Sequence, residues 1–203
     1  ETIHSDAVVL AVPAYVAADL LAATAPGLAE RLKAIRYVSS ATISLGYRRD
    51  ELLAQTRLDG FGFVVPKSEG RQIIACTWTS TKFNHRAPEA GLLLRAFVGG
   101  DGQEGLVDLP DEALFALVKQ ELADIMGLTL EPIVQKIFRW PQGTPQYDVG
   151  HLDRLAEMER LAAALPGLHL AGSAYRGVGL PDCINSARTV VAQIAAIVPQ
   201  KTF

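Results

Sequence analysis

Residues 167–184 constrain the fold of this chain more than any other stretch. A short apolar run, Leu168–Ala171, predicts a buried strand that ends at Gly172. After two further glycines, Pro181 suits a first helical position, because its fixed φ and missing N–H are tolerated there. Apolar residues then recur at helical spacing, which predicts a helix with one apolar face: Ile184, Ala187, Val191, Ile194, Ala195 and Val198.

A strand, a glycine-rich turn and a helix can together form a ligand site. The geometry points backbone N–H groups and the positive end of a helix toward an anion or an electron-rich ring edge. Glycines in the turn let such a ligand approach the main chain. An ordinary tight connection between a strand and its covering helix has the same pattern, so spacing alone leaves both interpretations open.

The composition indicates a globular chain and excludes several function classes. Of 203 residues, 49% are hydrophobic and 20% are charged, enough to bury a core. The net charge of −3 gives no reason to expect nucleic acid as a partner. No apolar run approaches the roughly 18 residues of a membrane span, and no signal peptide is visible. The two cysteines suggest reduced thiols and a cytoplasmic location rather than a disulfide framework.

No catalytic or metal-binding set is evident among the side chains. The four histidines do not stand at metal-ligand spacing with another His, Cys or carboxylate. His151 follows a glycine at a predicted helix start, where a surface or capping role is expected, and His169 lies in a predicted buried strand. We therefore assign no catalytic residue and no metal site.

The pattern of residues 37–98 predicts an antiparallel meander. Residues 37–47 alternate between an apolar face and a face of small, hydroxyl-bearing side chains, as in a period-2 strand. Strand-like runs at 61–65, 71–79 and 92–98 follow, separated by turn residues. The small side chains would let a flat ligand lie close, although a half-exposed strand would look the same.

Further elements complete an α/β (α+β) fold. We predict a first strand at 6–12, a strand at 130–140, a loop at 140–151, and helices at 15–23, 28–35, 111–126 and 152–165. The expected architecture is a mixed or antiparallel sheet with helices on one side. Strands and a helix from the two chain ends, including Val9 and Leu170, should meet in a second sheet.

Two strings resemble a known family. Ala-Tyr-Arg-Gly-Val-Gly-Leu-Pro-Asp-Cys-Ile at 174–184 closely resembles the C-terminal flavin motif of protoporphyrinogen oxidases, which belong to the flavin-containing amine oxidase superfamily. Arg-Trp-Pro at 139–141, with Pro-Gln-Tyr-Asp-Val-Gly-His at 145–151, is the second resemblance. The segment 60–100 is similar to the substrate-domain sheet of bacterial members.

The resemblance implies FAD as cofactor and assigns residues to it. The backbone at 178–180 would stabilise the pyrimidine edge of the reduced flavin, and Gly172 would allow close approach near the ribityl or phosphate region. An aromatic near the flavin is expected at Trp140, and Ser173 departs from the acidic residue common in amine oxidases. The implied cofactor residues are Gly172, Ser173, Val178, Gly179, Leu180 and Trp140.

The resemblance also implies a reaction and a substrate surface. The intact enzyme would oxidise protoporphyrinogen IX through FAD and pass the electrons to O2, giving H2O2; coproporphyrinogen III is the alternative substrate. Ile43, Phe63 and Val65 are expected to wall the tetrapyrrole pocket. No arginine of this chain is assigned to the substrate carboxylates. Peripheral contact with the cytoplasmic membrane is a family expectation, and oligomerisation stays open.

The resemblance covers only part of the family's protein. No Gly-x-Gly-x-x-Gly follows a strand in these residues, so the dinucleotide pyrophosphate site is missing and the segment alone should be inactive. We expect residues 1–20 and 168–203 to complete an FAD-binding domain, 21–140 to belong to a substrate-binding domain, and 141–167 to connect them. A non-catalytic porphyrin-binding or interaction domain that lacks flavin is the rival interpretation.

Overall fold

The computed structural model describes residues 1–197, which divide into two compact units. The first comprises residues 1–37 with 144–197, and the second residues 38–143. The boundaries differ from the expected ones because the helices at 26–33 and 151–163 pack into the core of the first unit. Which ligand each unit binds stays a prediction. No helix within residues 1–197 combines the length and apolar character needed to cross a membrane.

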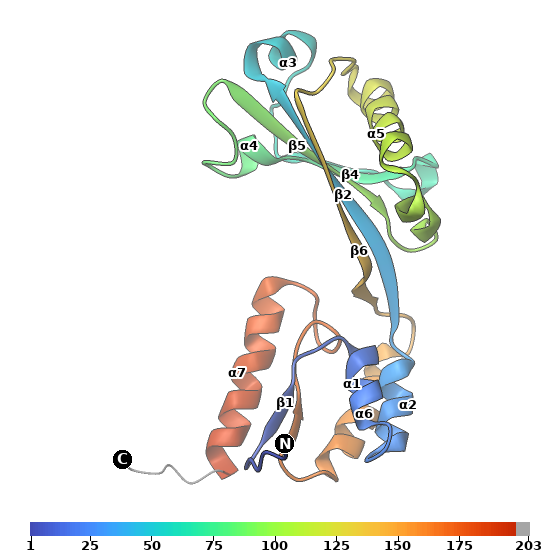
Figure 1. The fold of residues 1–203 in the computed structure, drawn as a ribbon, viewed down its shortest axis with the longest axis vertical. Coiled ribbons are helices and arrows are strands. Elements are labelled where there is room, and N and C mark those ends of the chain that lie inside the picture. Colours follow the sequence, from blue (N-terminus) through green and yellow to red (C-terminus); the bar gives the residue numbers. More distant parts are fainter. Residues whose placement is uncertain (198–203) are drawn as a thin grey trace. The chain divides into compact units, whose positions relative to one another are not determined.

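The first unit combines an N-terminal segment, residues 1–37, with a C-terminal segment, residues 144–197 (Figure 1). Strands β1 (Val8–Leu10) and β7 (Leu168–Leu170) pair in parallel, with Val9 opposite His169. This pairing confirms that Val9 and Leu170 belong to one sheet. The helices of the unit are α1 (Ala14–Leu21), α2 (Pro26–Lys33), α6 (His151–Ala163) and α7 (Leu180–Ile197).

Helices α1, α2 and α6 supply most of the core of the first unit. Its buried members are Ala14, Ala17, Ala18, Leu21, Leu28, Ala29, Leu32, Ile35, Leu155, Met158, Ala174 and Tyr175. Helix α7 contributes little, because Val190 is its one buried residue and Ile184 and Val191 of its predicted apolar face are 59% and 64% exposed. Val198, at the end of that predicted face, lies outside the described residues.

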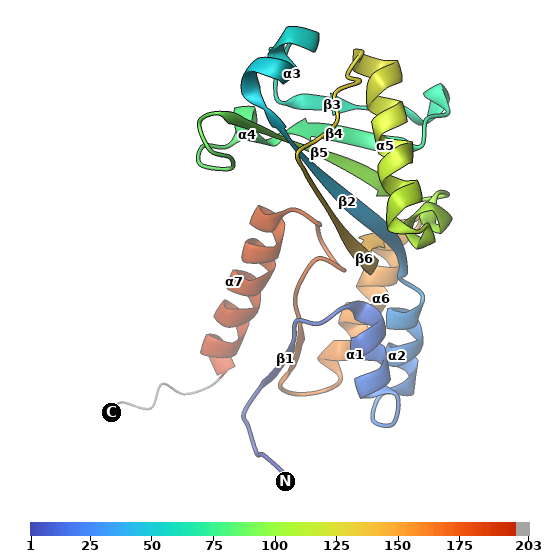
Figure 2. The same ribbon diagram turned by 45° about the horizontal axis from the view of Figure 1, so that its top comes forward.

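The second unit is built on a five-stranded sheet with the order β3-β4-β5-β2-β6 (Figure 2). Its pairs β3–β4, β4–β5 and β5–β2 are antiparallel, which confirms the predicted meander for β3, β4 and β5, whereas β2 pairs with β5 and not with β3. The strands are β2 (Arg36–Arg48), β3 (Gly62–Val64), β4 (Ile73–Trp78), β5 (Gly91–Gly99) and β6 (Val134–Gln146), and the helices are α3 (Arg49–Gln55), α4 (Thr79–Lys82) and α5 (Asp111–Met126). Two 3-10 turns, at Lys67–Glu69 and Glu104–Asp108, join these elements.

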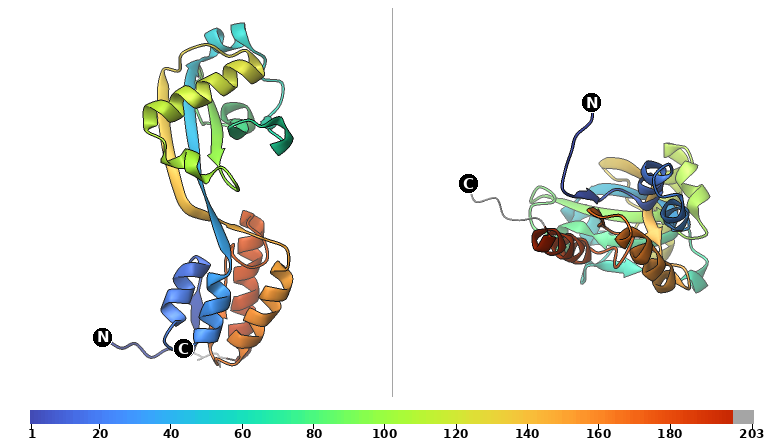
Figure 3. Two further views of the ribbon diagram at one scale, coloured as in Figure 1. Left: turned by 90° about the vertical axis from the view of Figure 1, so that its right-hand side faces the viewer. Right: turned by 90° about the horizontal axis from the view of Figure 1, so that it is seen from below.

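Helix α5 lies across one face of this sheet (Figure 3). Its buried side chains Leu114, Val118 and Leu122 meet the apolar face of β2, which carries Ala41, Ile43, Leu45 and Tyr47. The alternation predicted for β2 is therefore correct. The other side of the sheet, which we call the opposite face, carries Ser40, Thr42, Ser44, Thr77, Arg95 and Phe97, because these residues alternate with the core residues of their strands.

The predicted loop at 140–151 is wrong over its first half. Strand β6 continues to Gln146 and includes Pro141 and Pro145. The sequence suggested a loop because proline cannot donate a ladder hydrogen bond. Within residues 1–197, β6 has β2 as its only neighbouring strand, and an edge strand tolerates proline because one of its sides needs no donors.

Candidate functional site

Gly172 opens the turn between β7 and α7. Its φ of +118° belongs to a backbone region that side chains rarely adopt, and its N–H donates to Ser186 Oγ at 3.2 Å. A Cβ built at this position would meet no atom within 4 Å. The glycine is thus required by the backbone conformation rather than by crowding, and it leaves open space beside the main chain for a ligand.

Gly177 and Gly179 are held against Asp182 in the first turn of α7. At Gly177, where φ is +151°, a Cβ would lie 2.5 Å from Asp182 Oδ2, so no side chain fits. The Gly179 N–H donates to the same carboxylate oxygen at 3.2 Å. Our expectation that this amide points at a cofactor therefore needs correction, because an acidic side chain within the motif already accepts from it. A carboxylate there also complements the positive end of the helix.

Val178 and Leu180 remain at the surface of the turn. Their exposed fractions are 54% and 81%, and α7 begins at Leu180. The first amides of a helix have no acceptor within that helix. These two residues, together with Gly172, are the part of the predicted cofactor set that the first unit leaves accessible.

Tyr147 joins the two ends of the turn, a role that the residue patterns did not reveal. Its hydroxyl accepts from the Gly177 N–H at 2.9 Å and donates to the Ser173 carbonyl oxygen at 2.5 Å. Burial raises the pKa of the Tyr147 phenol, which keeps the donating proton in place. The only sequence signal for this role was the Pro145–His151 string of the family resemblance.

The His151 ring stacks on the Tyr147 ring. His151 is buried, so the expected surface or capping role is wrong. The two rings stack with centroids 4.0 Å apart at an interplanar angle of 10°. His151 Nε2 lies 2.8 Å from the Tyr175 carbonyl oxygen, and since a carbonyl only accepts, this nitrogen carries the hydrogen. Tyr147 and His151 thereby anchor the turn at residues 173, 175 and 177.

A cavity of about 900 Å³ lies between α6 and α7 in the first unit. Its lining is mostly apolar and includes Met158, Leu168, Leu170 and Val190. Within residues 1–197 no group of three or more His, Cys, Asp or Glu side chains could hold a metal ion.

Trp140 stands on β6 in the second unit. Its side chain is 53% exposed, and its indole Nε1–H donates to Thr42 Oγ1 at 3.4 Å on the opposite face. The indole is therefore not part of the core of the second unit. The ring is available to a flat ligand, and it neighbours the hydroxyl-bearing side of β2.

The opposite face does not carry the three residues predicted to wall the tetrapyrrole pocket, Ile43, Phe63 and Val65. Ile43 is fully buried in the core beneath α5, and Phe63 and Val65 pack against the same cluster. Phe63 pairs with Cys76, itself 1% exposed, which places both on the covered face. All three residues therefore lie on the side of the sheet that α5 covers, Ile43 fully buried and Phe63 and Val65 half-buried.

A match to a protein-family model shows which family the chain belongs to. The model for flavin containing amine oxidoreductase matches residues 1–195. The chain belongs to this family. Membership confirms the superfamily that the sequence resemblance implied, and it makes a flavin the cofactor type that goes with this fold.

Several relatives are named for porphyrinogen oxidation. The chain is 38% identical over 192 residues to coproporphyrinogen III oxidase of Bacillus subtilis (strain 168), with 94% of the chain and 40% of the relative covered. It is 30% identical over 202 residues to the chloroplastic protoporphyrinogen oxidase of Oryza sativa subsp. japonica, with 96% and 38% covered. The resemblance to protoporphyrinogen oxidases is confirmed.

Solved structures agree with this fold. A crystal structure from Exiguobacterium sp. 255-15, provisionally assigned as a protoporphyrinogen oxidase, matches with a TM-score of 0.77 at 40% identity, covering 94% of this chain and 41% of that one. A redesigned putrescine oxidase matches with a TM-score of 0.68 at 18% identity, covering 94% and 42%, and supports the fold alone. The chain thus spans about two fifths of the length of these family members.

Proposed function

We propose that this chain is the part of an FAD-dependent porphyrinogen oxidase that supplies the C-terminal flavin turn and a substrate-binding sheet. The observation that carries the proposal is the turn at 172–180, which Tyr147 ties at Ser173 and Gly177 in a chain of the flavin amine oxidoreductase family. The rest of the cofactor site would come from the portion of such proteins that this chain does not match.

The residues of the turn fit a flavin. Open space beside Gly172 admits a group against the main chain, and Val178 and Leu180 are exposed at the start of α7. A bound flavin would accept hydride from the substrate and deliver the electrons to O2. The protein's own contribution here would be hydrogen bonding from the exposed main chain at Val178 and Leu180, because the Asp182 carboxylate already accepts from the Gly179 N–H and offsets the positive end of α7.

The opposite face of the second unit supplies the proposed substrate surface. Trp140 and Thr42 form one end of it, and half-buried Phe97 on β5 lies opposite Thr42 across the strands. Aromatic and small side chains in this arrangement suit a flat, largely apolar macrocycle. This surface replaces Ile43, Phe63 and Val65 in the proposal, since Ile43 belongs to the core and Phe63 and Val65 pack against it.

Two substrates are consistent with the family. Protoporphyrinogen IX follows from the motif resemblance, and coproporphyrinogen III is favoured by the bacterial relatives, which reach 38% identity against 30% for the rice protein. Both are reduced tetrapyrroles with carboxylate arms, so the proposal at this level is a porphyrinogen. The proposed cytoplasmic location rests on the cysteine content of the sequence, since two cysteines give no disulfide framework.

The decisive experiment uses the full-length protein that contains these residues. We expect it to purify with FAD, released on denaturation and identified by chromatography, and to convert a porphyrinogen to the fluorescent porphyrin while consuming O2. A colourless protein that gains no oxidase activity on addition of FAD would contradict the proposal. If such a protein still bound porphyrin, the rival interpretation as a non-catalytic porphyrin-binding domain would be correct.

A further inference from the structure

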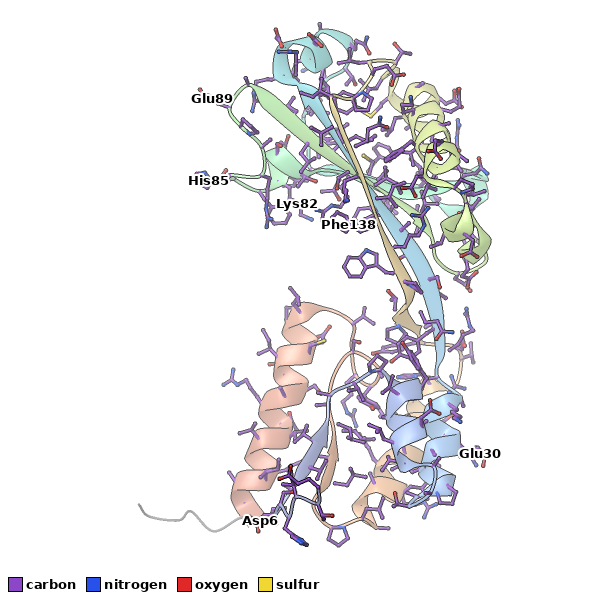
Figure 4. All side chains as sticks on the ribbon, in the orientation of Figure 1. Asp6, Glu30, Lys82, His85, Glu89 and Phe138 are labelled. Atoms are coloured by element: carbon purple, nitrogen blue, oxygen red, sulfur yellow. The ribbon has the colours of Figure 1, made fainter. Side chains whose placement is uncertain are left out.

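A small pocket on the opposite face of the second unit is lined by positive charge. It has a volume of about 190 Å³ and lies between β4, β5 and the segment that follows β4. Arg95 lines it from β5, and Lys82 and Arg86 line it from residues 79–90. Figure 4 labels Lys82 and the nearby His85 in this segment.

Arg95 is aimed into this pocket by the strand register. It lies opposite Ser44 on one side and Thr77 on the other, which puts its side chain on the face away from α5. Its Nε is buried and has no hydrogen-bond partner. A guanidinium N–H removed from water without an acceptor costs about 1–3 kcal/mol, so this group gains from any acceptor that enters the pocket.

Lys82 and Arg86 are placed by an aromatic ring. Lys82 Nζ lies 5.4 Å and Arg86 Cζ 5.6 Å from the centroid of Phe83, which is within cation–π range. The shared ring keeps both cations at the pocket without neutralising them. Within residues 1–197, no carboxylate forms an ion pair with Lys82, Arg86 or Arg95.

Three unneutralised cations around one pocket create a site for an anion. Their mutual repulsion is relieved when a negative charge binds between them, and an arginine can pair with a carboxylate through two parallel hydrogen bonds. Thr77 adds a hydroxyl, and Phe97 adds an apolar wall. The preferred ligand is therefore a carboxylate on an apolar stem.

The volume limits how much of a ligand the pocket can hold. Sites for drug-sized ligands occupy roughly 300–1,000 Å³, and a tetrapyrrole macrocycle is a ligand of that size class. A pocket of about 190 Å³ accepts a single short acid arm and excludes the macrocycle. The ring would have to remain outside, over the rest of the opposite face.

We propose that Arg95, Lys82 and Arg86 bind one propionate carboxylate of the porphyrinogen and so orient the macrocycle on the sheet. This inference rests on the proposed function, since it takes the substrate to be a porphyrinogen. It assigns the three residues to binding and orientation and not to the redox chemistry.

The test compares an acid substrate with its ester in the full-length flavoprotein. Coproporphyrinogen III and its tetramethyl ester are assayed with the wild-type protein, Arg95→Gln, and the double variant Lys82→Gln/Arg86→Gln. We expect the ratio of kcat/KM for acid over ester to fall about tenfold in each variant, mainly through KM of the acid. Arg95→Lys should recover part of the ratio because it keeps the charge.

Lys119→Gln serves as the matched control. Lys119 lies on α5, over the covered face of the sheet, and pairs with Glu131 at 2.9 Å. Its acid-to-ester ratio should equal that of the wild type. A fall as large as that of the pocket variants would mean that overall charge, not the pocket, selects the acid, and it would overturn the proposal.

The outcomes separate this inference from the proposed function. If the wild-type protein oxidises neither coproporphyrinogen III nor protoporphyrinogen IX, as acid or as methyl ester, the proposed function fails; if it oxidises only protoporphyrinogen IX, the ratio is measured with that acid and its dimethyl ester. If acid and ester are both oxidised and the ratio is unchanged in Arg95→Gln and in the double variant, the carboxylate site fails while the oxidase stands. For a variant with too little activity, fluorescence titration with coproporphyrin III supplies the answer: binding weakened about tenfold supports the site, and unchanged binding overturns it.

Discussion

The Tyr147 hydroxyl and the Gly177 amide nitrogen, 30 residues apart in the chain, lie 2.9 Å from each other. The same hydroxyl donates to the Ser173 carbonyl oxygen, so one side chain spans the turn that leads into α7. Residues 173–177 form no regular helix or strand, and their backbone groups need partners from elsewhere. Tyr147 provides two of these partners and thereby sets the path of the flavin motif.

Removing this hydroxyl should loosen the turn. Tyr147→Phe keeps the ring stack on His151 but leaves the Gly177 N–H and the Ser173 carbonyl without their partner. We expect the free energy of unfolding to fall by about 1–3 kcal/mol and the Kd for FAD to rise about tenfold. Chemical denaturation and flavin titration of the full-length apoprotein measure the two effects.

Tyr15→Phe is the control for that change. Tyr15 belongs to the same unit and packs edge-on against Tyr37 with ring centroids 5.1 Å apart. Its hydroxyl has no hydrogen bond within the part of the chain that the structure describes. FAD affinity should therefore stay at the wild-type value, and an equal loss in both variants would argue against a specific role for Tyr147.

Gly177→Ala should disrupt the motif more severely. A methyl group at this position would lie 2.5 Å from the Asp182 carboxylate, in a backbone conformation with φ of +151°. Relief requires Asp182 to leave the Gly179 N–H or the turn to change its path, and we expect loss of bound FAD together with about 1–3 kcal/mol of stability. The flavin content of the purified protein reports the effect directly.

Gly27→Ala makes the same chemical change without the clash. Gly27 lies in α2, and an added Cβ would meet no atom within 4 Å. Because alanine favours helix, stability should stay the same or rise by up to about 1 kcal/mol. Flavin loss in this variant would show that the Gly177 result is not specific to the turn.

Substitutions at the neighbouring positions 42 and 43 of β2 should affect different properties, substrate binding at Thr42 and stability at Ile43. Ile43→Ala opens a cavity in a fully buried site and should cost about 2–5 kcal/mol of stability. Thr42→Ala, on the opposite face, should cost less than about 1 kcal/mol and instead free the Trp140 indole from its hydrogen bond. Denaturation curves together with KM for the porphyrinogen test this; a large KM change in correctly folded Ile43→Ala would return that residue to the substrate surface.

Alkaline pH should destabilise the protein through buried acids. Burial raises the pKa of the Cys76 thiol to about 12, and it also raises the pKa values of the Tyr47 and Tyr175 phenols. Each group is neutral when protonated, so its contribution is complete below its unfolded pKa and is lost as pH rises toward its folded pKa. From about pH 9 upward, stability should fall by up to about 1.4 kcal/mol per pH unit for each ionising group.

Denaturation midpoints measured between neutral and alkaline pH check this slope. Tyr47→Phe removes one of the titrating groups and should make the alkaline decline less steep. A slope unchanged by this substitution would mean that Tyr47 does not titrate differently on folding. Thiol alkylation tests the burial of Cys76 separately. Cys76, at 1% exposure, should react only after unfolding, whereas half-buried Cys183 should react in the folded protein.

Much of the local structure followed from residue patterns. The helix predicted at 111–126 has those bounds in the structure, because Gly127, with φ of +69°, ends it in the left-handed conformation that glycine favours. The alternation along β2 correctly separated its two faces. The strand, turn and helix at 168–197 formed as predicted, and the parallel pairing of β1 with β7 joined segments from opposite ends of the chain.

Other features depended on the fold as a whole. The sequence by itself determined that β2 has an apolar and a polar face, since side chains alternate along any strand. Only the tertiary structure decided that α5 covers the apolar face, which buries Ile43 completely and Phe63 and Val65 in part. The tie between Tyr147 and Gly177, and the grouping of Arg95 with Lys82 and Arg86, arose in the same way. Periodicity in the sequence assigns each side chain to one face of its strand or helix. Contacts between residues distant in the sequence depend on how these elements pack.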